Sequence, residues 1–270
     1  MANHESVFSS VTEIPFVNRV ASVFVHVTDL RRSAEWYSRL LGLPMMEERM
    51  NGGPVYWFDF EGTHLILDSN RVNRQNLDWD EGMMPRIMFE AKSIDDAYRY
   101  IQEKGEPLLE LERHGTMAFF NFRDPEGNTH MACWSEQGDA DALITGQSPI
   151  LPRVGGVFVD VKNIREAARW YSDLLGVPFD EDVAAQHIYS VPVISGASLL
   201  LDQNRYLNQE SFTEVFYFET EDFEAALAFV RSEGFELAGE PSYFPDLSEF
   251  TLLDPDGNRI VIAKMNERGK

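Results

Sequence analysis

The chain has 270 residues, of which 44% are hydrophobic, enough for one large domain or two ordinary domains with packed cores. Its 45 acidic residues against 23 Lys and Arg give a formal net charge of -22. That charge, without any cluster of basic residues, argues against nucleic acid or an anionic membrane surface as a partner. The single cysteine, Cys133, excludes an intrachain disulfide and fits a reducing compartment.

The chain is expected to carry neither a signal peptide nor a membrane span. Residues 1–16 lack a basic start followed by an apolar run. No uncharged apolar stretch approaches the roughly 20 residues that cross a bilayer. We therefore expect a cytoplasmic protein, with residues 1–19 as an N-terminal extension.

The first half alternates strand and helix patterns. Runs of β-branched and aromatic residues indicate strands, and apolar side chains at helical spacing indicate helices. Thr28 or Asp29 is a suitable N-cap for the first helix, and Gly42 followed by Pro44 marks its end. The elements in chain order are a strand at 23–27, a helix at 30–41, strands at 56–60, 64–67 and 87–91, a helix at 94–104, and strands at 117–122 and 129–134.

The second half repeats the first. Residues 23–44 read VFVHVTDLRRSAEWYSRLLGLP, and residues 157–178 read VFVDVKNIREAARWYSDLLGVP, at a constant offset of 134. Each half also closes on a related turn, DPEGN and then DPDGN. The chain is therefore a duplicated domain. The predicted units are a first domain at 20–135, a polar linker at 136–152 and a second domain at 153–266.

The order of elements, the WYSxLLG helix end and the DPxGN turn resemble the vicinal-oxygen-chelate superfamily, which includes glyoxalases, bleomycin-resistance proteins and extradiol dioxygenases. The resemblance covers nearly the whole chain, in two tandem copies. It implies an α+β fold in which four βαβββ modules pair into two domains. Each domain would be a curved, mixed, eight-stranded sheet that forms an open cup with its helices outside, and ligands would bind inside the cup.

Residue parity indicates which face of each strand lines the cup. Alternate side chains of a strand share a face. Val23, Val25 and Val27 form an aliphatic face that suits packing against a helix. The opposite, mixed face carries Phe24 and His26, and we expect it to line the cavity.

The resemblance implies a divalent metal at the floor of the cup in the family's metalloenzymes. Its ligands would be His, Gln or Glu on the first strand of each module, and a Glu after the Gly-Asn turn. Such donors converge on a hard or borderline cation and leave positions open for substrate. In this chain the aligned positions hold Ser22, Arg86, Met131, Gly156, Val215 and Val261. None is a good metal ligand, so no cofactor is expected and glyoxalase or dioxygenase chemistry is not carried over.

A displaced metal site is the alternative. His26, His64 and Glu90 all share the predicted cup face of the first domain. One divalent metal ion held by these three residues would need ligand distances of roughly 2.0–2.2 Å, which strand parity alone does not establish.

The first cup is the more polar of the two. Trp57 is suited to stacking on a planar ligand, and Arg86 to clamping a carboxylate or phosphate. Alternatively, Arg86 pairs with Glu90 on the same strand face. The connection at 70–84 is predicted either to cover the cup or to be a solvent-exposed loop. The candidate ligand-binding residues are Ser22, Phe24, His26, Trp57, His64, Arg86, Glu90, Asn121 and Met131.

The second cup is predicted to be more apolar, with Phe158, Val215, Tyr217 and Val261 on its face. Its charged candidates are Asp160, Glu219 and Glu249. These carboxylates would act as acid and base, bind a cationic ligand, or lie at a solvated rim. No residue is assigned a catalytic role, because no other catalytic signature is present.

Three functions remain open from the sequence. The leading hypothesis is metal-independent binding or sequestration of a small organic molecule, as the resemblance to bleomycin-resistance proteins implies. The second is a metal-dependent lyase or dioxygenase with a displaced site. The third is a structural or interaction protein with degenerate cups. The expected partner is a small-molecule ligand, and the two domains pair either within a monomer or within a homodimer.

Overall fold

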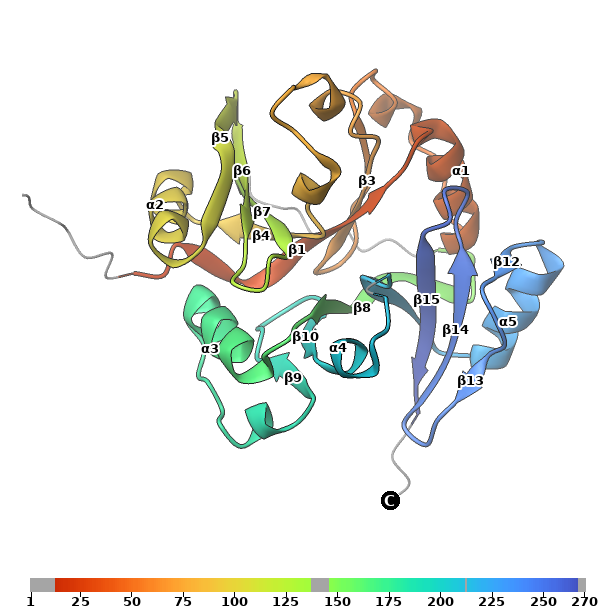
Figure 1. The fold of residues 1–270 in the computed structure, drawn as a ribbon. Helices are drawn as coiled ribbons and strands as arrows, with labels where there is room; N and C mark the ends of the chain where they lie inside the picture. The colour runs from red at the N-terminus through yellow and green to blue at the C-terminus, as the bar shows by residue number, and fades with distance from the viewer. Residues whose placement is uncertain (1–12, 137–145, 212, 267–270) are drawn as a thin grey trace, which may run out of the picture.

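The computed structural model describes residues 13–136, 146–211 and 213–266, which form two tandem domains (Figure 1). Each domain is a sheet curled into a half-barrel with helices on its outer side, so the predicted α+β class and the four modules are confirmed. Residues 1–12 of the predicted extension and 137–145 of the predicted linker lie outside the described residues.

The first domain contains seven strands rather than the eight expected, because its first module contributes three. The sheet order is β2-β3-β1-β4-β7-β6-β5, with the two helices outside it. The elements are β1 (Phe16–His26), α1 (Leu30–Leu41), β2 (Val55–Phe58), β3 (His64–Asp68), β4 (Ile87–Ala91), α2 (Ile94–Lys104), β5 (Glu106–His114), β6 (Met117–Arg123) and β7 (Thr129–Ser135), with 3-10 turns η1 (Glu47–Arg49), η2 (Asn73–Gln75) and η3 (Glu81–Met83).

The second domain repeats this plan with eight strands. Its order is β12-β14-β15-β11-β8-β10-β9, and β13 pairs with β14. The elements are β8 (Ile150–Asp160), α3 (Ile164–Leu175), η4 (Val183–Ala185), β9 (Ile188–Val191), β10 (Ser198–Asp202), α4 (Asn204–Asn208), β11 (Phe216–Thr220), α5 (Phe223–Ser232), β12 (Glu236–Leu237), β13 (Ser242–Tyr243), β14 (Leu247–Leu253) and β15 (Arg259–Met265).

Local sequence explains how α1 begins and ends. The Asp29 side chain accepts a hydrogen bond from the Arg32 backbone N–H at 3.1 Å, so Asp29 rather than Thr28 is the N-cap. Gly42 adopts a left-handed backbone with φ of 64°, and its Cα lies too close to the chain near Ser148 for a side chain. Burial is also as predicted, since Val23, Val25 and Val27 all lie in the core.

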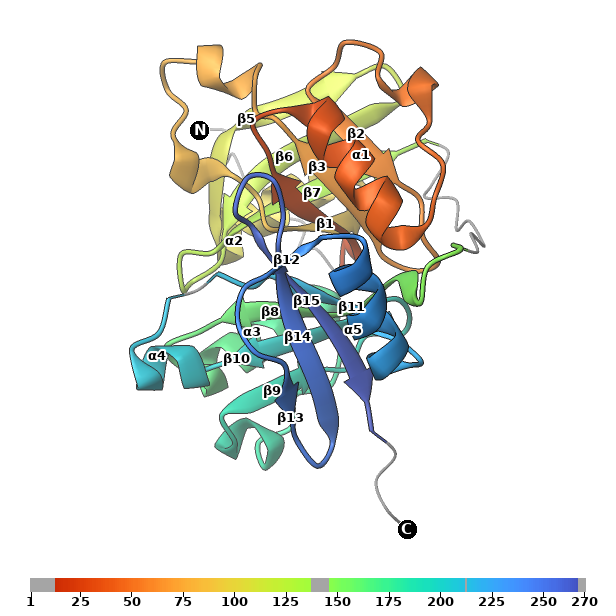
Figure 2. The same cartoon turned by 90° about the vertical axis from the view of Figure 1, so that its right-hand side faces the viewer.

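The repeated motifs form hydrogen bonds between the two domains. The Tyr171 hydroxyl on α3 donates to Asp124 Oδ2 in the turn of the first domain (2.6 Å) and accepts from His130 Nε2 (2.6 Å). In the equivalent contact, the Tyr37 hydroxyl on α1 donates to Asp254 Oδ2 in the second domain (3.1 Å). Thus the helix motif of each half binds the turn motif of the other half. Figure 2 shows the turn between β14 and β15 lying beside α1.

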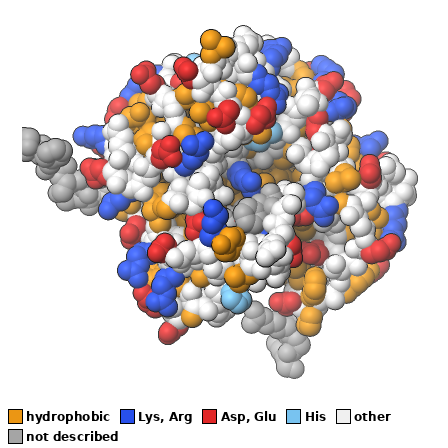
Figure 3. Space-filling view, viewed as in Figure 1, with side chains coloured by type: hydrophobic (Ala, Val, Ile, Leu, Met, Phe, Trp, Pro, Cys, Tyr) orange, Lys and Arg blue, Asp and Glu red, His pale blue; other side chains and the backbone are white. Residues whose placement is uncertain are grey.

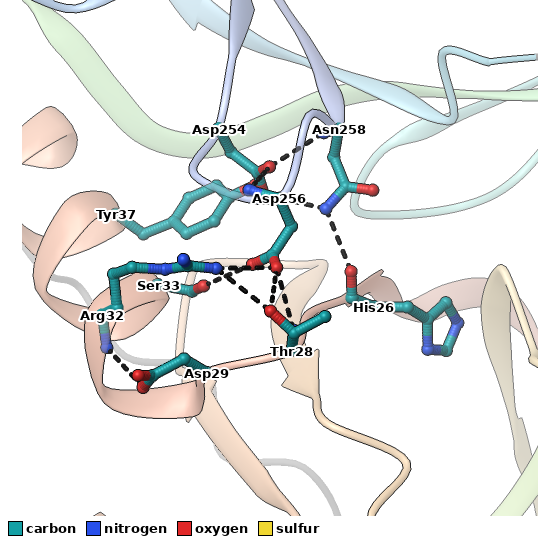
Figure 4. A network of polar contacts seen from close by, with 9 residues as sticks. All are labelled: His26, Thr28, Asp29, Arg32, Ser33, Tyr37, Asp254, Asp256 and Asn258. Atoms are coloured by element: carbon teal, nitrogen blue, oxygen red, sulfur yellow. Dashed lines mark hydrogen bonds and ion pairs between the residues drawn. The ribbon is translucent and has the colours of Figure 1, made fainter.

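The turn of the second domain makes further contacts with α1 (Figure 4). The Asp256 carboxylate accepts hydrogen bonds from the Thr28 backbone N–H (3.1 Å), from Arg32 Nη2 (2.7 Å) and from Ser33 Oγ (3.1 Å). Asn258 Nδ2 donates to the His26 carbonyl at 3.0 Å. These bonds hold the two domains in a fixed relative position.

The Asp256 contacts predict a pH dependence. Burial alone would raise the pKa of Asp256, but hydrogen bonds from Thr28, Arg32 and Ser33 outweigh it and hold the pKa below its ordinary value. A carboxylate with a depressed folded-state pKa stabilises the fold above the unfolded value of about 3.9, and that stabilisation is lost as pH falls through the folded pKa. We expect Asp256→Asn to be less stable than wild type at neutral pH, with a difference that shrinks below about pH 4. Denaturant unfolding at several pH values measures this, and a pH-independent difference would rule the mechanism out.

Two glycines meet where the domains touch. Gly62 and Gly196 occupy equivalent repeat positions, and both have positive φ, at 83° and 75°. A Cβ on Gly62 would lie 2.5 Å from the Gly196 Cα, so no side chain fits there. Nearby, Thr63 Oγ1 accepts from the Ala197 N–H at 2.9 Å and donates to Val20 O at 2.7 Å.

This contact predicts a large cost for Gly62→Ala. Gly52 is a matched control, because its φ is 88° and nothing lies within 4 Å of the position that a Cβ would take there. Gly52→Ala should lose about 1–2 kcal/mol through backbone strain alone. Gly62→Ala should lose about 1–3 kcal/mol more from the clash between the domains. Chemical denaturation compares them, and equal losses would show that the glycine contact is not tight.

Candidate functional site

A cavity of about 380 Å³ lies between the two domains. The face shown in Figure 3 is hollowed between the domains, and basic side chains lie in the hollow. Both domains contribute walls, so neither domain contains this site alone. The lining residues are Phe24, Val25, His26, Glu81, Gly82, Met84, Arg86, Gly127, Asn128, Thr129, Thr213, Val215, Asn258, Arg259 and Ile260.

Two asparagines of the turn motifs hold equivalent positions in the cavity wall. Asn128 Nδ2 donates to the Asp160 carbonyl at 3.1 Å, and Asn258 Nδ2 donates to the His26 carbonyl at 3.0 Å. Each amide nitrogen therefore binds the backbone of the opposite domain. The Asn258 amide oxygen points away from these partners in Figure 4, which leaves it available as an acceptor.

The two domains line the cavity with equivalent backbone positions, but the charges of the side chains at these positions differ. Arg86 of the first domain is matched by Val215 of the second, and Thr129 is matched by Arg259. One arginine therefore enters the cavity from each domain at positions that are not equivalent. A ligand in this cavity would meet different groups at its two ends.

Arg86 does not pair with Glu90, so that alternative from the sequence is wrong. Glu90 Oε2 instead accepts from Arg19 Nε at 2.9 Å. Arg86 stands at the entry to β4, beside the second domain, where its Nη1 lies 3.9 Å from Asp160 Oδ2. The Asp160 side chain is fully buried, whereas that of Arg86 is 34% exposed. Burial raises the pKa of Asp160, and the positive charges of Arg205 and Arg86 oppose this increase.

His26 is engaged at both ring nitrogens. Its Nε2 lies 2.8 Å from the Pro85 carbonyl, which can only accept, and its Nδ1 lies 2.8 Å from Asn70 Nδ2, which can only donate. The proton therefore sits on Nε2. Burial lowers the pKa of His26, against the hydrogen bond to Pro85 that raises it. The ring is neutral and has no nitrogen left for a ligand.

The alternative metal set from the sequence is not assembled. His26 is occupied as described, His64 Nδ1 accepts from the Phe60 backbone N–H at 3.0 Å, and Glu90 is paired with Arg19. Within residues 13–136, 146–211 and 213–266, no group of three or more His, Cys, Asp or Glu could hold a metal ion. The displaced site is therefore wrong in its residues.

Of the nine predicted ligand-binding residues, Phe24, His26 and Arg86 line the interdomain cavity. The others do not: Ser22 and His64 are buried in the sheet, Glu90 is paired, and Met131 packs with Phe24 in a small apolar cluster. The guanidinium of Arg49 lies 4.9 Å from the centre of the Trp57 ring, so one face of that ring is already covered.

Asn121 marks where the 70–84 connection is anchored. Its Nδ2 donates to the Met83 carbonyl at 3.1 Å, and Thr129 Oγ1 donates to the Gly82 carbonyl at 2.6 Å. The second part of the connection therefore forms a wall of the cavity, while Leu77 at its tip is fully exposed. The exposed tip agrees with the prediction of a solvent-exposed loop, whereas the second part lines the interdomain cavity.

The second cup holds a network of charges. Arg205 Nη1 lies 3.3 Å from both Asp160 oxygens, and Arg205 Nη2 lies 3.3 Å from Glu214 Oε2. Glu214 also accepts from Arg259. Asp160 is thus an internal counter-ion, and the prediction that it lies at a solvated rim is wrong. Glu249 lines a separate cavity of about 320 Å³, where burial raises its pKa.

Known families and solved structures share this fold. The family model for the Glyoxalase/Bleomycin resistance protein/Dioxygenase superfamily matches residues 19–131 and 153–262.

The chain belongs to this superfamily. Among solved structures it is similar to the Mn(II)-bound glyoxalase from Novosphingobium aromaticivorans, with 12% identity, a TM-score of 0.59, and coverage of 93% of this chain and 83% of that one. It is also similar to homoprotocatechuate 2,3-dioxygenase from Arthrobacter globiformis, with 16% identity, a TM-score of 0.56, and coverage of 94% and 81%. No curated protein matches. At these identities the likeness shows the fold alone.

The superfamily's metal chemistry does not fit the residues present. The strand register corrects two of the positions expected from the sequence: Met88 rather than Arg86 lies in line with Ser22 and Met131, and Tyr217 rather than Val215 lies in line with Gly156 and Val261. Met88 lies between Ser22 and Met131 in the sheet, which makes the floor of the first cup apolar. Aliphatic and thioether side chains are poor ligands for hard metals.

Several cavity residues were missed from the sequence, notably Asn128, Thr213, Asn258 and Arg259. The asparagines belong to the DPxGN motif, which indicates a repeated turn but not what the turn contacts. Their role becomes visible only when each turn meets the other domain.

Within the part of the chain that the structure describes, no helix is long and apolar enough to cross a membrane.

Proposed function

We propose that this member of the superfamily binds a small organic molecule in the interdomain cavity without using a metal. The proposal is carried by one observation with two parts. The open cavity of about 380 Å³ has convergent polar groups, and the positions that align with the superfamily's metal ligands hold no suitable donors. Ligand cavities of this size, with a few placed polar groups on apolar walls, are typical of small-molecule sites.

The walls of the cavity supply both kinds of contact. Phe24, Met84 and Ile260 are apolar, and the asparagine oxygens with the Arg86 guanidinium supply directed polar contacts. His26 is a poor candidate for proton transfer, because both of its nitrogens are engaged and burial lowers its pKa. Binding or sequestration therefore fits these residues better than turnover.

A metal-dependent lyase or dioxygenase is the second candidate. The fold likeness to a Mn(II)-bound glyoxalase and to dioxygenases supports it. The residues at the aligned positions oppose it.

The open cavity also disfavours a purely structural role. The pairing of the two domains within one chain supports a monomer, and one cysteine in 270 residues supports a cytoplasmic location.

A fragment screen on chelator-treated protein tests the proposal. Ligand-observed NMR would use a library of anionic, neutral and cationic fragments, before and after addition of MnCl₂. We expect fragments to bind the chelator-treated protein with affinities that Mn²⁺ does not change. Fragments that bind only after Mn²⁺ is added, or that are chemically converted, would contradict the proposal and favour the metal-dependent enzyme.

A further inference from the structure

Arg86 lies beside a network of ion pairs that is complete without it. Arg205 and Arg259 share Glu214, and Arg205 also faces Asp160. Asp202 adds a carboxylate near Asp160, and Glu249 adds one near Arg205. Glu81 at the entrance to the interdomain cavity is exposed and pairs with Arg74 at 3.1 Å.

Arg86 is the guanidinium of this group that has no hydrogen-bonded acceptor among the described residues. Its 3.9 Å approach to Asp160 is longer than a hydrogen bond, whereas Arg205 lies 3.3 Å from both oxygens of the same carboxylate. Asp160 is therefore already neutralised without Arg86. Among the described residues, no hydrogen-bond acceptor faces the Arg86 guanidinium at bonding distance, although its side chain lines the cavity.

An unbonded guanidinium in a partly enclosed cavity selects for a particular ligand. Its planar fork matches a carboxylate through two parallel hydrogen bonds. The apolar side chains of Phe24, Met84 and Val215 share the cavity and exclude water, which strengthens a charge-assisted bond. Arg259, the other arginine in the cavity wall, already pairs with Glu214, so a ligand group that carries two negative charges finds no second unpaired cation.

We infer that the ligand of this cavity is a carboxylate-bearing organic anion, anchored through its carboxylate to the Arg86 guanidinium. The inference rests on the proposed function, because it names the chemical class of molecule that the same cavity takes. It requires no metal, covalent step or co-reactant.

Benzoate and benzamide are matched probes, since they differ in charge but hardly in shape. Isothermal titration of the chelator-treated full-length protein at low ionic strength should show benzoate binding at least about tenfold more tightly than benzamide. Arg86→Met should abolish that preference, and Arg86→Lys should keep part of it, because lysine retains the charge without the fork. Phenylphosphonate at pH 8, mostly a dianion, should bind more weakly than benzoate.

Arg99→Met is the control for long-range charge effects. Arg99 is exposed on α2 and pairs with Asp96, so this variant makes the same change in net charge away from the cavity. It should keep the wild-type preference for benzoate. If Arg86→Met does not fold, as judged by circular dichroism, Arg86→Lys and the salt dependence of benzoate binding take its place.

Several outcomes would overturn the inference. These are equal affinities of benzoate and benzamide for wild type, an unchanged preference in Arg86→Met, or tighter binding of phenylphosphonate than of benzoate. If neutral fragments bind in the cavity without any preference for anions, the carboxylate assignment fails and the proposed function stands. If no fragment of any charge binds, both fail.

Discussion

Replacing Asp124 with alanine should lower the free energy of unfolding by about 3–5 kcal/mol, the range found when one member of a buried polar pair is removed. Asp124 is buried and accepts from the Tyr171 hydroxyl (2.6 Å), from Asn128 Nδ2 (3.0 Å), and from the backbone N–H groups of Glu126 (2.9 Å) and Asn128 (2.8 Å). Alanine would leave these donors buried and unsatisfied. It would also remove the hydrogen bond between the turn of the first domain and Tyr171 on α3 of the second.

The pKa of Asp124 agrees with this role. Burial alone would raise that pKa, but the neighbouring His130 ring and the hydrogen bonds from Tyr171 and Asn128 outweigh burial and hold it below its ordinary value. A depressed folded-state pKa means that the ionised carboxylate stabilises the fold at neutral pH.

Urea denaturation followed by tryptophan fluorescence measures the effect. Asp78→Ala is the control, since Asp78 is exposed in the 70–84 connection, and it should change stability by less than about 0.5 kcal/mol. Tyr171→Phe, which removes the hydrogen bonds with Asp124 and His130 and keeps the ring, should cost about 1–3 kcal/mol. A loss below that range for Asp124→Ala would mean that the domains do not depend on this contact.

Val215→Trp should weaken ligand binding in the interdomain cavity by at least about 100-fold, which corresponds to about 2.7 kcal/mol. Val215 is partly buried and lines the cavity at the position of the second domain that is equivalent to Arg86. An indole in its place would occupy much of the space of about 380 Å³ that a ligand needs. Because the side chain enters existing open space, the free energy of unfolding should change by less than about 1.5 kcal/mol.

The measurement is titration of the fragments that bind wild type, together with denaturation of the same variant. Val72→Trp is the matched control, because Val72 is 54% exposed and does not line the cavity, and it should bind like wild type. Unchanged affinity in Val215→Trp would place the ligand elsewhere, such as the cavity beside Glu249 in the second cup.

The repeat made most of the fold predictable. A constant offset of 134 between two copies of one motif requires two copies of one local structure. Strand parity then identified the core face, and Val23 and Val25 are buried as expected. Capping chemistry located the ends of α1, because Asp29 and Gly42 act through bonds to residues close in sequence. Features that depend on residues close in sequence, such as helix caps and strand faces, can therefore be predicted from the sequence.

The site was less predictable, because its contacts join distant residues. Parity placed Arg86 and Glu90 on one face, but it could not show that Asp160 of the other domain lies beside Arg86. Parity likewise could not show that both nitrogens of His26 are engaged. The turn asparagines acquire their role only through docking of the domains. A cavity formed between two domains has no signature within either one.

The most direct test of metal-independent function is the metal content of the purified full-length protein, measured by inductively coupled plasma mass spectrometry after growth with added Mn, Fe and Zn. The residues at the aligned positions predict far less than one metal ion per chain, together with fragment binding that chelation leaves unchanged. A content close to one Mn or Fe per chain, with binding lost on chelation, would contradict the proposal and assign the protein to the metal-dependent enzymes of its superfamily.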